Sequence, residues 1–240
     1  MNAKGQLEAI LTNKYESEDG DMYQVEVMEG MSTEEIYNFR QKLPSQNLPN
    51  DIEELLKFSK GFEFYGLEEV QFDTFNYFGF VELFPRSIQL AGDGFGNFWI
   101  LDIDLKGNWN SVYFVCHDPA VVVKQAENLS QFISQVDEYG SKGGESTLGL
   151  VHDKVVFDIW NSKVGIMEKN EKIYDYDSMD VELPETFLVA DLVHQPIMKG
   201  FSWGKWGPNP KIVRLSDDPI WAVEKTVKQG WLSRIFWRKK

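Results

Sequence analysis

The stretch that decides the fold reads GDGFGNFWIL over residues 92–101. Its first six residues are typical of turns and the next four are large and apolar, so it predicts a tight hairpin turn that leads directly into a buried β-strand. A dinucleotide-binding loop does not fit, because that fingerprint requires glycine where Asn97 stands and a helix where this sequence predicts a strand.

Further strands flank this hairpin. Aromatic and β-branched runs, separated by turn residues, predict a series of antiparallel neighbours. The runs are Phe62–Tyr65, Val70–Phe72, Ile88–Leu90, Phe98–Leu101 and Val112–Val115, and a weaker alternating run at Tyr23, Val25 and Val27 precedes them. The segment 102–107 begins like a calcium loop, but its twelfth position is Tyr113 instead of a bidentate carboxylate. We therefore predict an acidic hairpin there, with a turn at Lys106–Asn108.

Two helices are predicted before the strands. Ser32 and Glu35 form a capping-box pair at the start of the first, which Pro44 ends. The second begins at Pro49–Asn50, and Gly61 is predicted to end it in the left-handed conformation. Its buried stripe consists of Ile52, Leu55 and Leu56.

A third predicted helix follows the strands. Asn128 and Gln131 are its capping pair, and its buried stripe consists of Leu129, Phe132, Ile133 and Val136. The order helix, helix, sheet, helix predicts an α+β fold.

The chain changes character near residue 140. We expect a first domain over residues 1–139, a Gly/Ser-rich linker over 140–146, and a Trp-rich C-terminal extension or second small domain over 147–240. Short apolar runs in the extension do not distinguish a strand from a buried helix, so its fold stays open. The tryptophan loop at residues 203–208 is assigned to packing in preference to ligand binding.

Charge is distributed unevenly along the chain. The net charge is −14, and all of the excess falls in residues 1–144, which hold 24 acidic and 10 basic residues, whereas residues 145–240 hold 14 of each. An acidic surface repels nucleic acid and anionic lipid and speeds the encounter with a basic protein. We therefore expect a protein partner and no nucleic acid, with a surface that serves only solubility as the alternative.

Residues that could carry chemistry form no recognisable constellation. Cys116 is the only cysteine and lies in an apolar run, which favours a buried thiol and excludes an internal disulfide or a multi-thiolate metal site. The three histidines have no spacing that places two on one face of an element, and no nucleophile elbow is present. We expect no enzyme, no metal and no cofactor.

The apolar runs and the two ends of the chain are informative about where in the cell the protein is located. No apolar run is long enough to cross a bilayer and the N-terminal residues lack a leader pattern, so we expect a cytoplasmic protein. Residues 231–240 read WLSRIFWRKK and place large apolar groups beside four cations. Membrane contact through Trp231–Lys240 is one interpretation. We favour a terminal helix that starts near Pro219 and packs against the protein.

The ordered motifs of the first part resemble those of the SUKH superfamily, which includes the Smi/Knr-type proteins. The resemblance rests on LPND at residues 48–51 with its helix, on GDGFG at 92–96, and on the segment from Val112 to Pro119 with the helix that follows, and it covers roughly residues 30–136. It implies a central, mostly antiparallel sheet with flanking helices. It also implies a protein without catalytic activity.

The resemblance implies two functions. Many bacterial members look like immunity proteins that neutralise a polymorphic toxin, often a nuclease, and we expect a basic toxin domain as the partner. The alternative is an intracellular regulator or scaffold of the Smi/Knr type, linked to cell-wall synthesis. Our hypothesis is that carboxylates of the sheet and its hairpins form the partner-binding face. They are Glu68, Glu69, Asp73, Asp93, Asp102 and Asp104.

Overall fold

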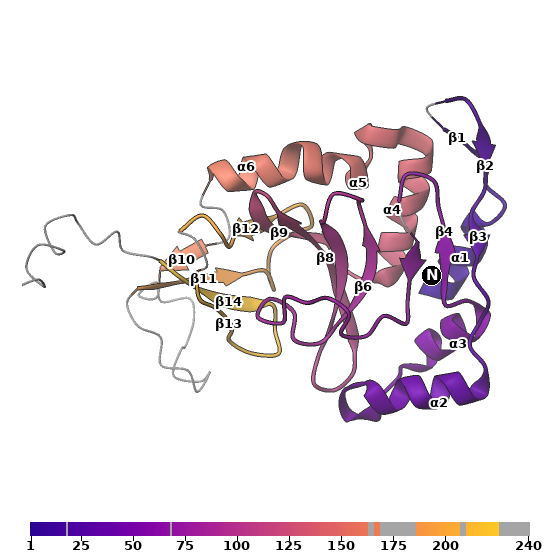
Figure 1. Ribbon diagram of the computed structural model, residues 1–240, viewed down its shortest axis with the longest axis horizontal. Coiled ribbons are helices and arrows are strands. Elements are labelled where there is room, and N and C mark those ends of the chain that lie inside the picture. Colours follow the sequence, from indigo (N-terminus) through magenta and orange to yellow (C-terminus); the bar gives the residue numbers. More distant parts are fainter. Residues whose placement is uncertain (18, 68, 163–165, 169–185, 207–209, 226–240) are drawn as a thin grey trace, which may run out of the picture.

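A computed structural model describes residues 1–240 except 18, 68, 163–165, 169–185, 207–209 and 226–240 (Figure 1). The helices are α1 (Ala3–Ile10), α2 (Thr33–Lys42), α3 (Asn50–Phe58), α4 (Leu129–Lys142), α5 (Thr147–Leu150) and α6 (Val156–Asn161), with the 3-10 turns η1 (Pro44–Gln46) and η2 (Gly143–Glu145) and the π-helical turn η3 (Val151–Val155). The strands are β1 (Tyr15–Glu16), β2 (Met22–Tyr23), β3 (Glu26–Val27), β4 (Gly61–Glu63), β5 (Val70–Gln71), β6 (Ser87–Gly92), β7 (Phe98–Ile103), β8 (Trp109–His117), β9 (Ala120–Ala126), β10 (Ile166–Glu168), β11 (Phe187–Asp191), β12 (Gly200–Ser202), β13 (Ile212–Arg214) and β14 (Ile220–Glu224).

The central sheet has the strand order β12-β9-β8-β7-β6, and every neighbouring pair in it is antiparallel. Smaller antiparallel sheets are formed by β3-β4-β5, by β1-β2 and by β10-β11-β14-β13. The α+β prediction is therefore confirmed, as are the two hairpin turns that precede and follow β7. The turns favour antiparallel neighbours because each returns the chain directly beside the strand that it leaves.

The central sheet is covered on both faces. Trp99, Leu101 and Phe114 point into one apolar cluster, which the helices complete, whereas Ile100 and Tyr113 point into another. This alternation follows from the two-residue period of a strand. The second cluster is completed by the sheet β10-β11-β14-β13, which lies beside the central sheet in Figure 1. The protein thus stacks helices, central sheet and C-terminal sheet in three layers.

Trp221 of β14 is the centre of the second cluster. Its side chain is fully buried, and its indole Nε1 donates a hydrogen bond to the Leu83 carbonyl oxygen at 2.8 Å. The ring meets Phe84 edge-on and lies 5.1 Å from the ring of Phe201, between centroids. The guanidinium of Arg214 lies 4.7 Å from its centroid, which is a cation–π distance. Large aromatic area and a satisfied N–H group make this residue an anchor for the C-terminal sheet.

The C-terminal extension also enters the central sheet. Strand β12 pairs with β9, and at Gly200 an added Cβ would lie 1.8 Å from the Val122 carbonyl oxygen, so only glycine allows this close approach. The extension therefore both lengthens the central sheet and forms a sheet of its own. Trp203 packs edge-on against Phe80 with 4.9 Å between centroids, in agreement with the packing role predicted for its loop. The domain division near residue 140 stays a prediction.

The predicted helices of the first part are present. Ser32 and Glu35 form the complete capping box of α2, and Asn128 accepts a hydrogen bond from the Gln131 backbone at the start of α4. The prediction for Gly61 was wrong. It lies in β4 with no left-handed backbone, and an added Cβ would lie 2.1 Å from the Val70 carbonyl oxygen. Glycine stands there because the neighbouring strand passes so closely.

Other predictions are corrected at the boundaries. Residues 140–142, assigned to a linker, are the last residues of α4, and η2 follows. The prediction of a terminal helix from Pro219 was wrong over the described residues, because Ile220–Glu224 is strand β14. The rest of the predicted helix lies outside the described residues. Sequence reasoning also missed α1 and the apolar strand β9.

Gly140 illustrates why a glycine in the helix does not signal a linker. The Tyr15 ring packs so closely on α4 that an added Cβ would lie 2.2 Å from its Cδ1 atom. Although alanine is the better helix former by about 1 kcal/mol, the substitution Gly140→Ala is expected to lower the free energy of unfolding by about 1–3 kcal/mol, because overpacking displaces Tyr15. Urea denaturation of the variant and the parent protein measures this difference in the free energy of unfolding. A stabilised variant would contradict the packing described.

Candidate protein-binding surface

The predicted carboxylates do not form one face. Asp93 precedes β7 and Asp104 follows it, so the two lie at opposite ends of a six-residue strand, about 20 Å apart by the rise of a strand. Glu69 is exposed and Asp73 is half-buried in the loop after β5. Glu68 lies outside the described residues.

Asp93 and Asp104 hold the two hairpin turns. The turns read DGFGN (93–97) and DLKGN (104–108), and in each the aspartate Oδ1 accepts backbone N–H groups two and four residues later while Oδ2 accepts the asparagine side chain. The glycine before each asparagine has a positive φ, 86° at Gly96 and 79° at Gly107. Partial burial acts to raise the pKa of Asp104, but hydrogen bonds from Asn108 and Lys106 outweigh it and hold the pKa below its ordinary value. These carboxylates thus have a structural role in the turns.

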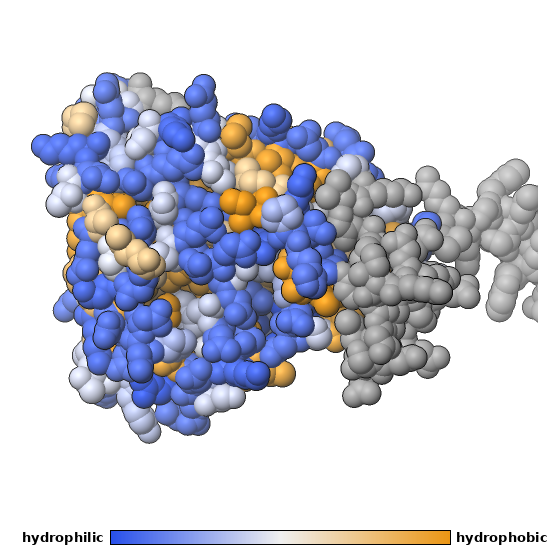
Figure 2. All heavy atoms as spheres, turned by 180° about the vertical axis from the view of Figure 1, so that it is seen from behind, coloured by the Kyte–Doolittle hydropathy of each residue, from blue (hydrophilic) through white to orange (hydrophobic). Residues whose placement is uncertain are grey.

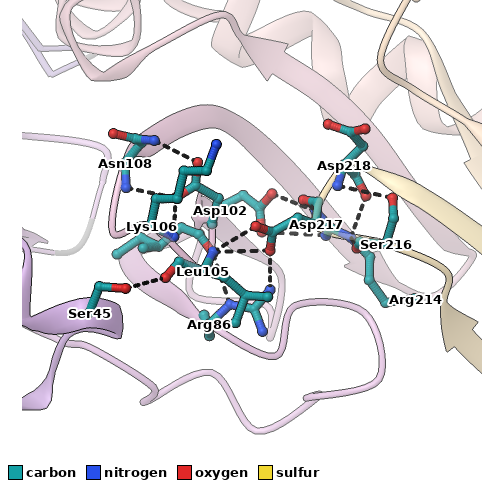
Figure 3. Close-up of polar contacts among 12 residues, drawn as sticks. Ser45, Arg86, Asp102, Leu105, Lys106, Asn108, Arg214, Ser216, Asp217 and Asp218 are labelled. Atoms are coloured by element: carbon teal, nitrogen blue, oxygen red, sulfur yellow. Dashed lines mark hydrogen bonds and ion pairs between the residues drawn. The ribbon is translucent and has the colours of Figure 1, made fainter. Parts of the chain in front are cut away.

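Asp102 must be removed from the predicted binding face. It is 3% exposed, and its carboxylate receives both terminal nitrogens of Arg214, with Nη2–Oδ2 at 2.7 Å and Nη1–Oδ1 at 3.3 Å (Figure 3). Burial raises the pKa of the Asp102 carboxyl, and the Arg214 guanidinium opposes that rise. The sequence places this residue in an acidic hairpin, but its partner stands 112 residues away.

The ion pair belongs to a network that joins the C-terminal sheet to the central sheet. Asp217 accepts a hydrogen bond from Arg86 at 2.7 Å and another from the Leu105 backbone, and Arg214 donates to the Asp217 and Asp218 carbonyl oxygens (Figure 3). Arg86, Asp102 and Leu105 come from the first part of the chain, whereas Arg214 and Asp217 come from the extension. The network therefore holds the C-terminal extension against the first part of the chain.

An acidic groove is lined by residues of β3 and β4. These two strands lie at the end of the molecule opposite the C-terminal sheet (Figure 1). The groove has a volume of about 380 Å³. Its walls consist of Tyr23, Gln24, Glu26, Glu63, Phe64, Tyr65, Leu67 and Glu69. Of the predicted carboxylates that the structure describes, only Glu69 lines it.

Three exposed carboxylates give the groove its charge. Glu26 and Glu63 are direct cross-strand partners of β3 and β4, and Glu69 follows on the loop to β5. Like charges directly opposite each other in a sheet are unfavourable. Among the described residues no cation forms an ion pair with any of the three. The groove therefore carries uncompensated negative charge.

Aromatic rings also line the groove. The Tyr23 ring lies 5.1 Å from that of Tyr65 and 5.4 Å from that of Phe64, between centroids. Behind them Tyr15 packs on Tyr23 and donates its hydroxyl to Asp137 of α4 at 2.8 Å. Burial, followed by the neighbouring tyrosines, raises the pKa of Tyr23, so its hydroxyl stays protonated at neutral pH. The ring contacts and the Tyr15 hydrogen bond join this aromatic cluster to α4.

The groove is suited to a cationic side chain. A lysine or arginine bound there would lie among exposed carboxylates and tyrosine rings, and both kinds of group attract a cation. Sequence reasoning missed Glu26 and Glu63. The signal for Glu63 was available, because it stands between the buried Phe62 and Phe64 and so must point outward from its strand.

The described residues offer little else. They contain no group of three or more His, Cys, Asp or Glu side chains that could hold a metal ion. Cys116 is fully buried, and burial raises the pKa of its thiol to about 11. None of the helices described has the length and apolar content to cross a membrane. The face seen in Figure 2 is mostly hydrophilic, with hydrophobic side chains in separate patches.

Comparison with known proteins assigns the central part of the chain. The SMI1 / KNR4 family (SUKH-1) matches residues 30–135. The resemblance to the SUKH superfamily is thus confirmed over this segment. No curated protein and no solved structure matched the chain. SUKH domains are typically protein-interaction modules and the family is generally non-catalytic. The segment includes Glu63, Tyr65 and Glu69 of the groove, but neither Tyr23 nor the C-terminal sheet.

The buried ion pair supplies a prediction. Arg214→Met leaves Asp102 without its partner in a buried site and is expected to lower the free energy of unfolding by about 3–5 kcal/mol. The double variant Asp102→Asn/Arg214→Met removes the buried charge as well and should recover part of that loss. Equilibrium denaturation of the three proteins gives the comparison. A single variant within about 1 kcal/mol of the parent would show that the pair is not structural.

Proposed function

We propose that the chain is an immunity protein that binds a basic toxin domain and neutralises it, with the acidic groove as its main contact. The observation that supports this is the set of three exposed carboxylates, Glu26, Glu63 and Glu69, without cationic partners among the described residues and beside the rings of Tyr23 and Tyr65. A toxin that cleaves nucleic acid needs a cationic cleft, and an acidic partner can occupy such a cleft by charge complementarity.

The proposal fits the charge of the whole chain. The chain has a net charge of −14, and residues 1–144 carry all of the excess negative charge. The resulting electric field accelerates association with a cationic partner and weakens as salt is added. The tyrosines would then provide the short-range contact, since Tyr is enriched at binding hot spots. No bond is made or broken in this function.

The test is recovery of a partner from the native cell by the tagged full chain, followed by binding kinetics. The groove variant Glu26→Lys/Glu63→Lys/Glu69→Lys is expected to lower the association rate constant at least tenfold at low salt and to flatten its salt dependence. The matched control, Glu34→Lys/Glu54→Lys/Asp158→Lys, changes the net charge equally at exposed positions on α2, α3 and α6. This control variant should retain most of the association rate constant of the parent protein.

A second measurement identifies the partner's class. If the partner is a toxin domain, co-expression of the chain should restore growth to cells that produce it, and the groove variant should not. Recovery of an endogenous protein of cell-wall synthesis, with no toxin, would instead favour the Smi/Knr-type regulator. Equal association rates for the groove variant and the control would refute the groove as the contact.

A further inference from the structure

The turn between β6 and β7 presents an exposed phenylalanine. Phe95 is 76% exposed, the largest exposed fraction among the aromatic side chains whose surroundings the structure describes. Its backbone N–H donates to Asp93 Oδ1 at 2.8 Å, and Gly94 and Gly96 on either side have φ values of 75° and 86°. A single exposed apolar side chain is common on a protein surface. The turn that holds Phe95 distinguishes it from such side chains.

The turn between β7 and β8 shows that folding does not require an aromatic side chain at this position. In both turns the aspartate carboxylate accepts the same set of hydrogen bonds. Lys106 takes the place of Phe95, and its backbone N–H donates to Asp104 Oδ1 at 2.9 Å. The Lys106 side chain is also exposed. A polar side chain is therefore sufficient for this type of turn, and the ring of Phe95 has no role in its formation.

The neighbouring turn between β8 and β9 braces the turn that holds Phe95. The Asn97 Oδ1 atom accepts the backbone N–H of His117 at 3.1 Å, and the His117 ring Nδ1 atom lies 2.9 Å from the same oxygen. Asn97 is 2% exposed, so these contacts are shielded from water. The backbone that carries Phe95 is thus ordered by hydrogen bonds from two turns. Because this order exists in the free protein, burial of the ring by a partner costs little conformational entropy of the backbone.

A second hollow connects the acidic groove with this turn. It has a volume of about 240 Å³ and is lined by Glu69 and Gln71 on one side and by residues 89–92 of β6 on the other. Glu69 also lines the acidic groove. Strand β6 is an edge of the central sheet and ends at Gly92, directly before the turn. The acidic groove, the second hollow and the Phe95 turn therefore follow one another on the surface.

The acidic groove alone is small for a stable protein interface. Such an interface takes about 20–30 residues from each partner, whereas eight residues line the groove. Aromatic side chains are enriched at the buried core of interfaces, and charged groups around them act mainly on the association rate and on specificity. A partner that binds the groove must contact further surface, and Phe95 offers an exposed aromatic ring along the surface described above.

We propose that Phe95 is a second contact of the interface that begins in the acidic groove, and that the partner, a basic protein domain, receives the ring in an apolar pocket beside its cationic surface. The inference rests on the proposed function, because it assigns the same partner to both contacts. The two contacts have different roles. The carboxylates of the groove accelerate association, whereas burial of the Phe95 ring slows dissociation.

Photo-cross-linking of the full chain in the native cell tests whether one partner meets both contacts. The photoreactive residue p-benzoylphenylalanine replaces Tyr65 in the groove, Phe95, or, as a control, Lys106 in the matching turn at the opposite end of β7. The first two variants are expected to cross-link to the same protein, which mass spectrometry should identify as one with a basic domain. The Lys106 variant should give about tenfold less of this product, because a partner seated on the groove and on Phe95 lies away from that turn.

The outcomes separate this inference from the proposed function. A product at Tyr65 with none at Phe95, or with a different protein at Phe95, would overturn the inference and leave the groove as the contact. A product at Phe95 alone would overturn the shared interface and contradict the groove as well. The absence of a product at both positions would contradict both proposals.

Binding kinetics with the cross-linked protein, once purified, measure the role of the ring. Phe95→Ala is expected to raise the dissociation rate constant about tenfold and to change the association rate constant by less than about threefold. The control Leu105→Ala shortens an exposed apolar side chain in the matching turn and should change neither constant. The denaturation midpoint of Phe95→Ala should equal that of the parent protein, because the matching turn forms without an aromatic ring. Equal dissociation rate constants for Phe95→Ala and the control would overturn the inference.

Discussion

The central sheet is apolar on both faces, and this constraint governs the rest of the structure. Side chains of β7 and β8 alternate between two buried clusters, so each face requires a cover. Helices cover one face. The sheet β10-β11-β14-β13 covers the other, with Trp221 buried against Tyr113 and Phe84 and with Arg214 paired to Asp102 at its margin. The C-terminal extension is thereby part of the core, although the family match ends at residue 135.

This arrangement limits where a partner can bind. Over the described residues neither face of the central sheet is open, so a partner must bind outside these two faces. The acidic groove lies on the small sheet, far from the C-terminal sheet in Figure 1. No described cation neutralises the exposed carboxylates of the groove, whereas the buried carboxylate of Asp102 is paired with Arg214. An acidic sequence therefore contains carboxylates with quite different roles.

Local signals in the sequence predicted much of the fold. The capping box of α2, the stripe of α3 and the turns at Gly94–Gly96 and Gly107 depend on residues close together in the chain, and all were confirmed. The failures involve distant residues. Nothing near Asp102 indicates Arg214, nothing near Gly140 indicates the Tyr15 ring, and nothing near Gly61 indicates the close approach of Val70. Glu69 was predicted for the binding surface, but Glu26 became its neighbour only through the pairing of β3 with β4.

The most direct test of this account is native-state hydrogen exchange in β8 and β14. If the C-terminal sheet is an integral cover, the slowest amides of both strands open with the same free energy, and Trp221→Ala lowers both by the same amount, about 3–5 kcal/mol for the loss of a buried indole. If β14 instead opens at a much lower free energy than β8, and the substitution affects β14 alone, the extension is a separate module and the account is wrong.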